Sequence, residues 1–171
     1  PEHIAWRYDP IIPTVHTAER FARLAREVAK QGVRRGVINF VAAPGRYRRV
    51  DRRLAPLLDG WGAGMPGYDA AWREAIARQV TAIASSEGIS LACCAESSAL
   101  AGRVPGLRPA ACADGGWFGR LSGRYPWANG AVPAAPPGGR SRPGCGCIRY
   151  FDVGDYGGWS RCYRCAYCYA G

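Results

Sequence analysis

Short apolar runs alternate with longer amphipathic stretches in the first hundred residues of the chain. Three of the runs are predicted strands, near residues 3–8, 34–41 and 89–94. Between them, apolar side chains recur every three or four residues, which predicts helices near residues 17–31 and 68–87. Strand, helix and strand in succession favour parallel pairing through a right-handed crossover. We therefore expect the three strands to be parallel neighbours with both helices on one side.

Local signals predict where these elements begin and end. Asp9-Pro10 is a turn signal that we expect to stop the first strand. Thr17 is the expected N-cap of the first helix, and Glu19 lies in its first turn, where the helix dipole favours a carboxylate. Gly32 is expected to end this helix. The pattern as a whole indicates the α/β class.

Two stretches lack clear periodicity. Arginines and one tyrosine fill Arg46-Tyr-Arg-Arg49, and Arg52 and Arg53 follow. Such a run can grip phosphate, but we interpret it as a solvated loop. Residues 99–144 are rich in glycine, proline, alanine and arginine, which is typical of a loop or linker. The expected organisation is an α/β part over residues 1–98, a linker over 99–144 and a cysteine-rich tail over 145–171.

The chain is strongly basic, with a formal net charge of +10. This charge suits a polyanion such as nucleic acid. Lys30 is the only lysine among 23 basic residues, however, and the abundant alanine, glycine and proline indicate a GC-rich coding bias. We therefore interpret most of the arginine as solvated surface and do not favour a nucleic-acid partner. No apolar run approaches the roughly 20 residues that span a bilayer, and no signal peptide is recognisable, so we expect a cytoplasmic protein without a membrane partner.

Candidate metal ligands gather in the tail. Five of the 8 cysteines form a CxC pair followed by CxxCxxC: Cys145, Cys147, Cys162, Cys165 and Cys168. Thiolates two residues apart can turn onto a common centre, and four of them satisfy either a tetrahedral zinc ion or an iron–sulfur cluster. In a reducing cytosol, clustered cysteines are ligands more often than disulfides. The tail is therefore predicted to be a metal site.

Polar side chains also lie near the predicted strand ends. The candidate catalytic residues are Arg7, Asp9, Asn39 and Glu96. Ligand sites of parallel α/β proteins gather at the carboxyl ends of strands, which would bring these residues into one cleft. The alternative is structural, with Asp9 capping a turn or pairing with Arg7.

Several segments, taken in order, resemble the bacterial domain-of-unknown-function family 1848 over nearly the whole chain. These segments are Trp6-Arg-Tyr-Asp-Pro-Ile11, His16-Thr17 with Arg20-Phe21, Cys94-Ala-Glu96, Cys112-Ala-Asp114-Gly115, and the tail from Cys145-Gly-Cys147 through Asp152-Val-Gly154 and Tyr156 to Cys165-Ala-Tyr167-Cys168-Tyr-Ala170. The resemblance implies the C-terminal portion of a longer protein, with a partial, incomplete TIM-like barrel before an irregular cysteine-rich tail. We accordingly expect the chain to be a fragment.

The resemblance also implies a cofactor, because members of this family look like radical-SAM or spore-photoproduct-lyase-like proteins. Cys162, Cys165 and Cys168 would then hold a [4Fe–4S] cluster whose open iron takes S-adenosylmethionine. Cys145 or Cys147 would be within reach as a fourth ligand, and Tyr167 and Tyr169 would pack around the sulfurs. The chain departs from the family pattern in two places: CxxCxYCYA stands for CxxxCxYCYA, and Val41-Ala42-Ala43 stands where the family has an acidic residue.

Two other functions remain open at this point. A zinc knuckle on a basic domain would grip nucleic acid through its arginines and the tail tyrosines. An inactive remnant would bind no metal. Three cysteines within seven residues are more typical of iron–sulfur clusters than of zinc ribbons, which favours the cluster.

Overall fold

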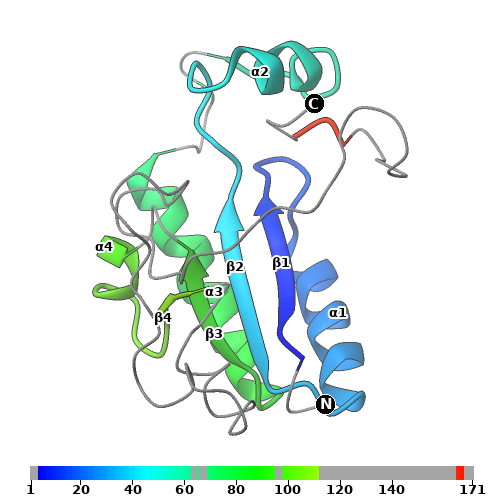
Figure 1. Ribbon diagram of the computed structural model, residues 1–171, viewed down its shortest axis with the longest axis vertical. Helices are drawn as coiled ribbons and strands as arrows, with labels where there is room; N and C mark the ends of the chain where they lie inside the picture. Colours follow the sequence, from blue (N-terminus) through cyan, green and yellow to red (C-terminus); the bar gives the residue numbers. More distant parts are fainter. Residues whose placement is uncertain (1–3, 63–64, 66–68, 95–97, 112–164, 168–171) are drawn as a thin grey trace, which may run out of the picture.

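Four parallel strands form one sheet in the computed structural model of the chain (Figure 1). The structure describes residues 4–62, 65, 69–94, 98–111 and 165–167. The strands are β1 (Trp6–Ile11), β2 (Arg35–Phe40), β3 (Ser90–Cys94) and β4 (Arg108–Ala110). Their order across the sheet is the order along the chain, β1-β2-β3-β4. The prediction that the first three strands are parallel neighbours is confirmed.

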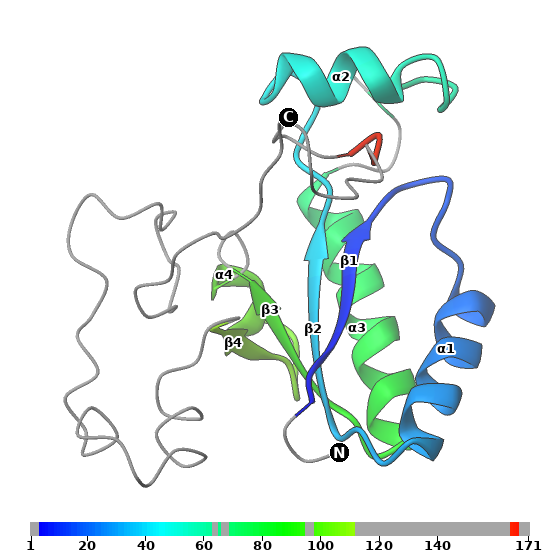
Figure 2. The ribbon, with the colours of Figure 1, turned by 45° about the vertical axis from the view of Figure 1, so that its right-hand side comes forward.

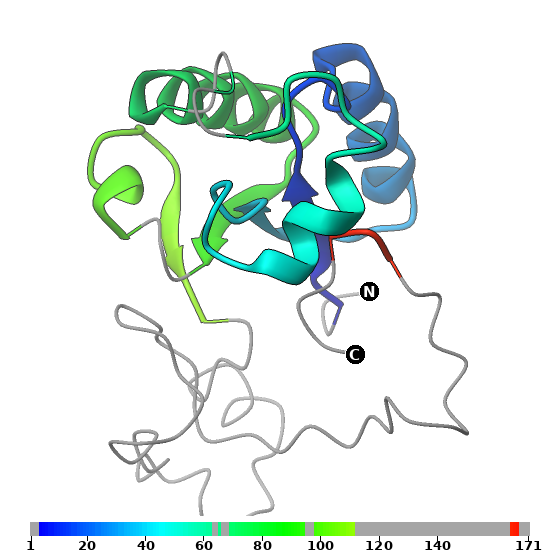
Figure 3. The ribbon, with the colours of Figure 1, turned by 90° about the horizontal axis from the view of Figure 1, so that it is seen from above.

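The two long helices cover one face of this sheet. The helices are α1 (Ala18–Lys30), α2 (Arg48–Leu54), α3 (Ala70–Ser86) and α4 (Ser98–Ala101). Seen from above, α1 and α3 lie side by side behind the strands, as predicted (Figure 3). The short helix α2 lies beyond the carboxyl ends of β1 and β2 (Figure 2). No helix in the described ranges has the length and apolarity to cross a membrane.

The start of α1 follows from its sequence. The Thr17 side chain accepts a hydrogen bond from the Arg20 amide at 3.2 Å, which satisfies one of the free N–H groups at the helix start. Glu19 lies in the first turn, and burial of Phe21 and Ala25 turns one side of the helix to the sheet. After the helix, Gly32 has a φ of 80°, a left-handed conformation that glycine adopts readily.

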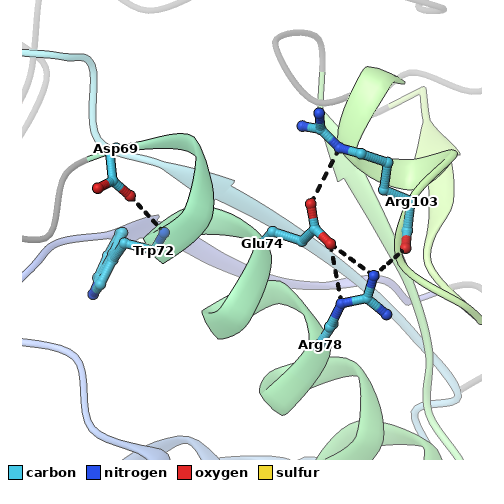
Figure 4. Close-up of polar contacts among 5 residues, drawn as sticks. All are labelled: Asp69, Trp72, Glu74, Arg78 and Arg103. Atoms are coloured by element: carbon cyan, nitrogen blue, oxygen red, sulfur yellow. Dashed lines mark hydrogen bonds and ion pairs between the residues drawn. The ribbon is translucent and has the colours of Figure 1, made fainter.

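The start of α3 and its contact with the following segment depend on carboxylates (Figure 4). Asp69 caps the helix by accepting from the Trp72 amide at 2.7 Å. One turn later, Glu74 contacts Arg78 at 2.7 Å and Arg103 at 3.3 Å. Arg78 also donates to the Arg103 carbonyl at 2.7 Å, so α3 is tied to the turn that follows α4.

The core lies between the sheet and the two long helices. Phe21 of α1, Val80 of α3, and Ile38 and Leu91 of the central strands are all buried in it. Gly36 leaves room for the Leu91 side chain of β3, because a Cβ at this position would lie 2.6 Å from the Leu91 Cδ2 atom. The packing is dense here, so a core substitution that changes side-chain volume would force its neighbours to repack.

Three local predictions are wrong. The first strand does not stop at Asp9-Pro10 but continues to Ile11, with a register shift between Tyr8 and Ile11. Proline has no N–H to donate, and it is tolerated here because β1 is the outermost strand of the described sheet. The carboxyl end of β1 is therefore three residues later than the predicted end at residue 8.

The expected basic loop contains the helix α2, and the expected linker begins with α4 and β4. In α2, Val50 and Leu54 lie one turn apart and are both buried, so packing stabilises a helix despite its charge. In the second case, Leu100, Val104 and Leu107 reach the main core. Most of the cysteine-rich tail, which we expected to be irregular, lies outside the described residues.

Candidate functional site

The face of the sheet opposite α1 and α3 carries a row of candidate side chains. Arg7, Val37 and Ala92 are in register across β1, β2 and β3, so their side chains share a face. In β2 and β3 the residues on either side of them are mostly buried toward the helices. On β1, Tyr8 likewise packs against Phe21 of α1. Arg7, Val37 and Ala92 therefore lie on the face that the two long helices leave open.

Two residues further along, Asn39 and Cys94 continue this open face toward the carboxyl ends of β2 and β3. Asp9 belongs to the same face, because its carboxylate contacts the Arg7 side chain. Asn39 and Cys94 are both half-buried. Cys94, the last residue of β3, lies at the strand end, as the predicted strand near residues 89–94 implied, although it was not among the predicted catalytic residues. Glu96 lies outside the described residues.

Arg7 and Asp9 form an ion pair. The Arg7 Nε donates to the Asp9 Oδ2 at 2.7 Å, and a second guanidinium nitrogen contacts the same oxygen. Arg7 is 52% exposed and Asp9 is 14% exposed. Arg7 is the second residue of β1 and not at its end, which corrects its predicted place. The contact is the one expected of a structural pair, and a catalytic role for either residue stays a prediction.

Residues 165–167 lie at the carboxyl end of the sheet, between α2 and the tip of β1 (Figures 1 and 2). The Arg53 guanidinium donates to the Cys165 carbonyl at 3.4 Å. Ala166 packs against a small apolar cluster formed by Val41, Val50 and Leu54. Tertiary contacts thus bring one of the predicted metal ligands to the edge where the strands end.

The thiol of Cys165 is half-buried, and the Tyr167 side chain is 40% exposed. Cys145, Cys147, Cys162, Cys168 and Tyr169 lie outside the described residues. Within the described ranges, no three potential metal-ligating side chains come together. The donor chemistry of the tail fits a cluster in one further respect. A cluster held by cysteine thiolates is anionic, and the Arg53 guanidinium, which contacts the Cys165 carbonyl, would offset part of that charge.

A second polar contact lies on the helix side of β1. The Tyr8 hydroxyl and the His16 Nδ1 are 3.0 Å apart, and both rings pack against Phe21. Burial, with a smaller effect of the Arg20 charge, lowers the pKa of His16 below its usual 6.5. Burial raises the pKa of Tyr8. At neutral pH the imidazole is therefore uncharged, and Nδ1 accepts from the tyrosine hydroxyl.

This pair is structural, because it faces the helix layer and not the open face. The His16 Nε2 is buried and has no hydrogen-bond partner among the described residues. Protonating this ring would place a charge in an environment that already disfavours it, next to the Arg20 guanidinium. The His16–Tyr8 contact therefore makes folding sensitive to pH.

We expect this contact to produce a pH-dependent loss of stability. The unfolded chain binds a proton on His16 near pH 6.5, whereas the folded chain binds it only at lower pH. The contribution of uncharged His16 to the free energy of unfolding should therefore be fully present above pH 6.5. It should be lost as the pH decreases from there toward the folded pKa. Urea titrations between pH 5 and 8 should show a shallower slope for His16→Asn, which keeps an acceptor for Tyr8. Equal slopes for both proteins would contradict the assignment.

Comparison with known proteins gives one match. A family model described as Domain of unknown function (DUF1848) matches residues 1–170. The match covers the α/β part together with the cysteine-rich tail. No curated protein and no solved structure matches the chain.

Proposed function

The chain belongs to the family described as Domain of unknown function (DUF1848), and we propose that it binds an iron–sulfur cluster through the cysteines of its tail. Cys162, Cys165 and Cys168 are the proposed ligands of a [4Fe–4S] cluster whose fourth iron stays open, and Cys145 or Cys147 would be within reach as an alternative fourth ligand that closes it. The observation that carries the proposal is the position of Cys165. Its carbonyl is bound by Arg53 at the carboxyl end of a parallel sheet, where α/β proteins place their ligand sites.

The surroundings of Cys165 support a cluster in physical terms. The apolar cluster of Val41, Val50 and Leu54, against which Ala166 packs, provides a wall that excludes water on one side. Arg53, which contacts the Cys165 carbonyl, supplies positive charge on the same side. Limited solvent and nearby positive charge are two of the factors that set the reduction potential of such clusters.

We further propose that the described sheet is part of a TIM-like barrel. A doubly wound sheet reverses its strand order and has helices on both faces. Here the strand order follows the chain, and α1 and α3 cover one face only, as in a barrel (Figure 3). In a barrel the open face would turn inward, with Asp9, Asn39 and Cys94 near its carboxyl-terminal mouth.

The proposed activity is of the radical-SAM type. When bound, a cluster with one iron free of cysteine supplies single-electron transfer and a place for S-adenosylmethionine. The chain's own residues would hold the other reactant. The half-buried Asn39 amide is suited to orient it by hydrogen bonds, and the Arg7–Asp9 pair would line the same face. Tyr167 and Tyr169 would pack around the sulfurs.

A zinc-binding, nucleic-acid-binding module is the second candidate. The observation in its favour is the group of arginines on α2, one of which, Arg53, contacts the Cys165 carbonyl. Four thiolates satisfy a tetrahedral zinc ion as well as they satisfy a cluster, so ligand number alone does not separate the two. Identifying the bound metal separates the two candidates.

Metal analysis of protein purified without oxygen tests the proposal. We expect a brown protein with broad absorbance near 400 nm and about four iron and four sulfide ions per chain, the content of one [4Fe–4S] cluster. Reconstitution with iron and sulfide in the absence of oxygen is the control for cluster lost during purification. A colourless protein that carries one zinc ion per chain, and that takes up no iron on reconstitution, would refute the cluster and favour the zinc module.

A further inference from the structure

We propose that α2 and the turn before it bind the phosphate backbone of a nucleic-acid strand. Four exposed arginines form this arginine surface: Arg46, Arg48, Arg49 and Arg52. Arg48, Arg49 and Arg52 belong to the short helix α2, which lies beyond the carboxyl ends of β1 and β2, and Arg46 lies in the turn before it (Figure 2). The inference does not depend on which metal, if any, the tail holds.

The single acidic residue of this segment does not neutralise the arginine surface. The Asp51 Oδ2 accepts from the Gly45 amide at 3.0 Å, and its Oδ1 accepts from the Trp61 indole N–H at 3.0 Å. Both carboxylate oxygens are therefore used to fix the loops on either side of α2. In the part of the chain that the structure describes, Arg48, Arg49 and Arg52 form no ion pair with a carboxylate.

Several cations of the long helices form ion pairs with carboxylates. Lys30 of α1 pairs with Glu27 at 2.8 Å, and Glu74 of α3 joins Arg78 and Arg103 (Figure 4). The Glu27–Lys30 and Glu74–Arg78 pairs have the helical spacing at which opposite charges attract each other.

In α2, by contrast, like charges occupy that spacing. Arg48 is followed by Arg52, and Arg49 by Arg53, so each pair of guanidinium groups lies one turn apart. Like charges four residues apart destabilise a helix. A biased genome explains many arginines, but it does not by itself place Arg48, Arg49 and Arg52, which have no carboxylate partner among the described residues, on one short helix beside the candidate site. A bound polyanion would offset this repulsion.

The geometry favours a phosphate backbone. Four residues of α-helix rise about 6 Å, and phosphates follow one another at about 3.4 Å along the axis of a nucleic-acid strand. Arginines one turn apart therefore span about two nucleotides. The planar guanidinium group also binds phosphate through two parallel hydrogen bonds. Contacts of this kind position a strand without reading its sequence.

A lipid surface fits less well. A membrane-binding helix needs an apolar face to insert, but Val50 and Leu54 of α2 are 2% and 3% exposed and turn toward the protein. Leu57 is exposed near the helix, but one leucine provides little anchoring. An acidic protein could engage single arginines, but arginines spaced one helical turn apart are better matched by evenly spaced phosphates.

The test compares two triple variants that lose the same charge. R48Q/R49Q/R52Q removes three cations from the arginine surface, and R23Q/R26Q/K30Q removes three exposed cations from α1. Binding of the full chain to a fluorescent single-stranded DNA of 20 nucleotides, and to its duplex, is measured by anisotropy between 50 and 200 mM salt. Thermal melting confirms that each variant is folded. R48Q/R49Q/R52Q should melt at no lower temperature than the unchanged protein, because the repulsion between the arginines of α2 is relieved.

We expect R48Q/R49Q/R52Q to bind at least tenfold more weakly and to reduce the slope of log K against log salt by about 2, because roughly 0.7–0.9 of a counterion is released per phosphate contact. The α1 variant should change affinity by less than about threefold.

Equal losses in both variants would overturn the proposal, because binding would then follow net charge alone. It would also be overturned if the unchanged protein bound neither DNA at 50 mM salt, or if it bound only anionic lipid vesicles or polyglutamate. Should the triple variant melt lower than expected, the single variant R49Q repeats the comparison against R23Q, with an expected loss of about threefold.

Discussion

Replacement of Phe21 by alanine should remove about 3–5 kcal/mol from the free energy of unfolding. Phe21 is 0% exposed. Its ring centroid lies 5.2 Å from that of Trp6, 4.9 Å from that of Tyr8 and 6.4 Å from that of His16. Truncation would therefore remove buried apolar surface and the ring contacts that join α1 to β1. The surrounding rings are large and stiff, so they can fill the cavity only in part.

Leu24→Ala on the same helix is the matched control. Leu24 is 38% exposed, so its truncation should cost about 1 kcal/mol or less, well below the cost of a buried site. Domains of this size are stable by only about 5–15 kcal/mol, so the Phe21 variant should lose a large fraction of its stability. Urea denaturation followed by circular dichroism measures both costs. If the two variants unfold at the same urea concentration, Phe21 does not hold α1 against the sheet.

Much of the α/β framework could be predicted from the sequence because its signals are local. Thr17 caps the first helix by a side chain three residues from its partner amide, and Phe21 and Ala25 mark its buried side. The alternation of buried and half-buried residues in β2 is likewise visible in the sequence. Local signals of this kind act through neighbours in the chain, so they need no knowledge of the tertiary structure.

The elements that were missed depend on tertiary contacts. The three residues of β4 show no alternation, and pairing with β3 makes them a strand. In α2 only Val50 and Leu54 carry an apolar signal, and their partner Val41 precedes the helix by several residues. Pro10 continues β1 because no described strand pairs with its outer edge. In each case the packed neighbour, and not the local sequence, decides the conformation.

The candidate site divides in the same way. Register could place Arg7 on one face of the sheet, but its ion pair with Asp9 competes with the predicted catalytic role. The approach of Cys165 to α2 had no signal in the sequence, because the Arg53 guanidinium and the Cys165 carbonyl are 112 residues apart along the chain. Every residue has a backbone carbonyl, so the amino-acid sequence does not indicate which carbonyl will be bound.

Cys165→Ser is expected to have the largest effect on the proposed cofactor. Cys165 is the middle residue of the CxxCxxC motif, and it lies at the carboxyl end of the sheet. Serine has nearly the same shape, but its hydroxyl stays protonated at neutral pH and is a poor ligand for iron. The substitution should therefore abolish cluster binding. Because Cys165 is only half-buried and outside the main core, the fold should be unchanged.

Cys94→Ser is the matched control. Cys94 is also half-buried and lies at the end of β3 on the open face, but it is not a proposed ligand. Far-ultraviolet circular dichroism of both variants should match that of the unchanged protein. This comparison separates the loss of one ligand from a general effect of removing a thiol.

The most direct test of the central claim is therefore the iron content and the absorbance near 400 nm of the three proteins, purified and reconstituted side by side without oxygen. Our account predicts about four iron ions per chain for the unchanged protein and for Cys94→Ser, and a nearly colourless Cys165→Ser with little iron. Full iron content and colour in Cys165→Ser would contradict it, because the cluster would then be held without the cysteine that the fold brings to the edge of the sheet.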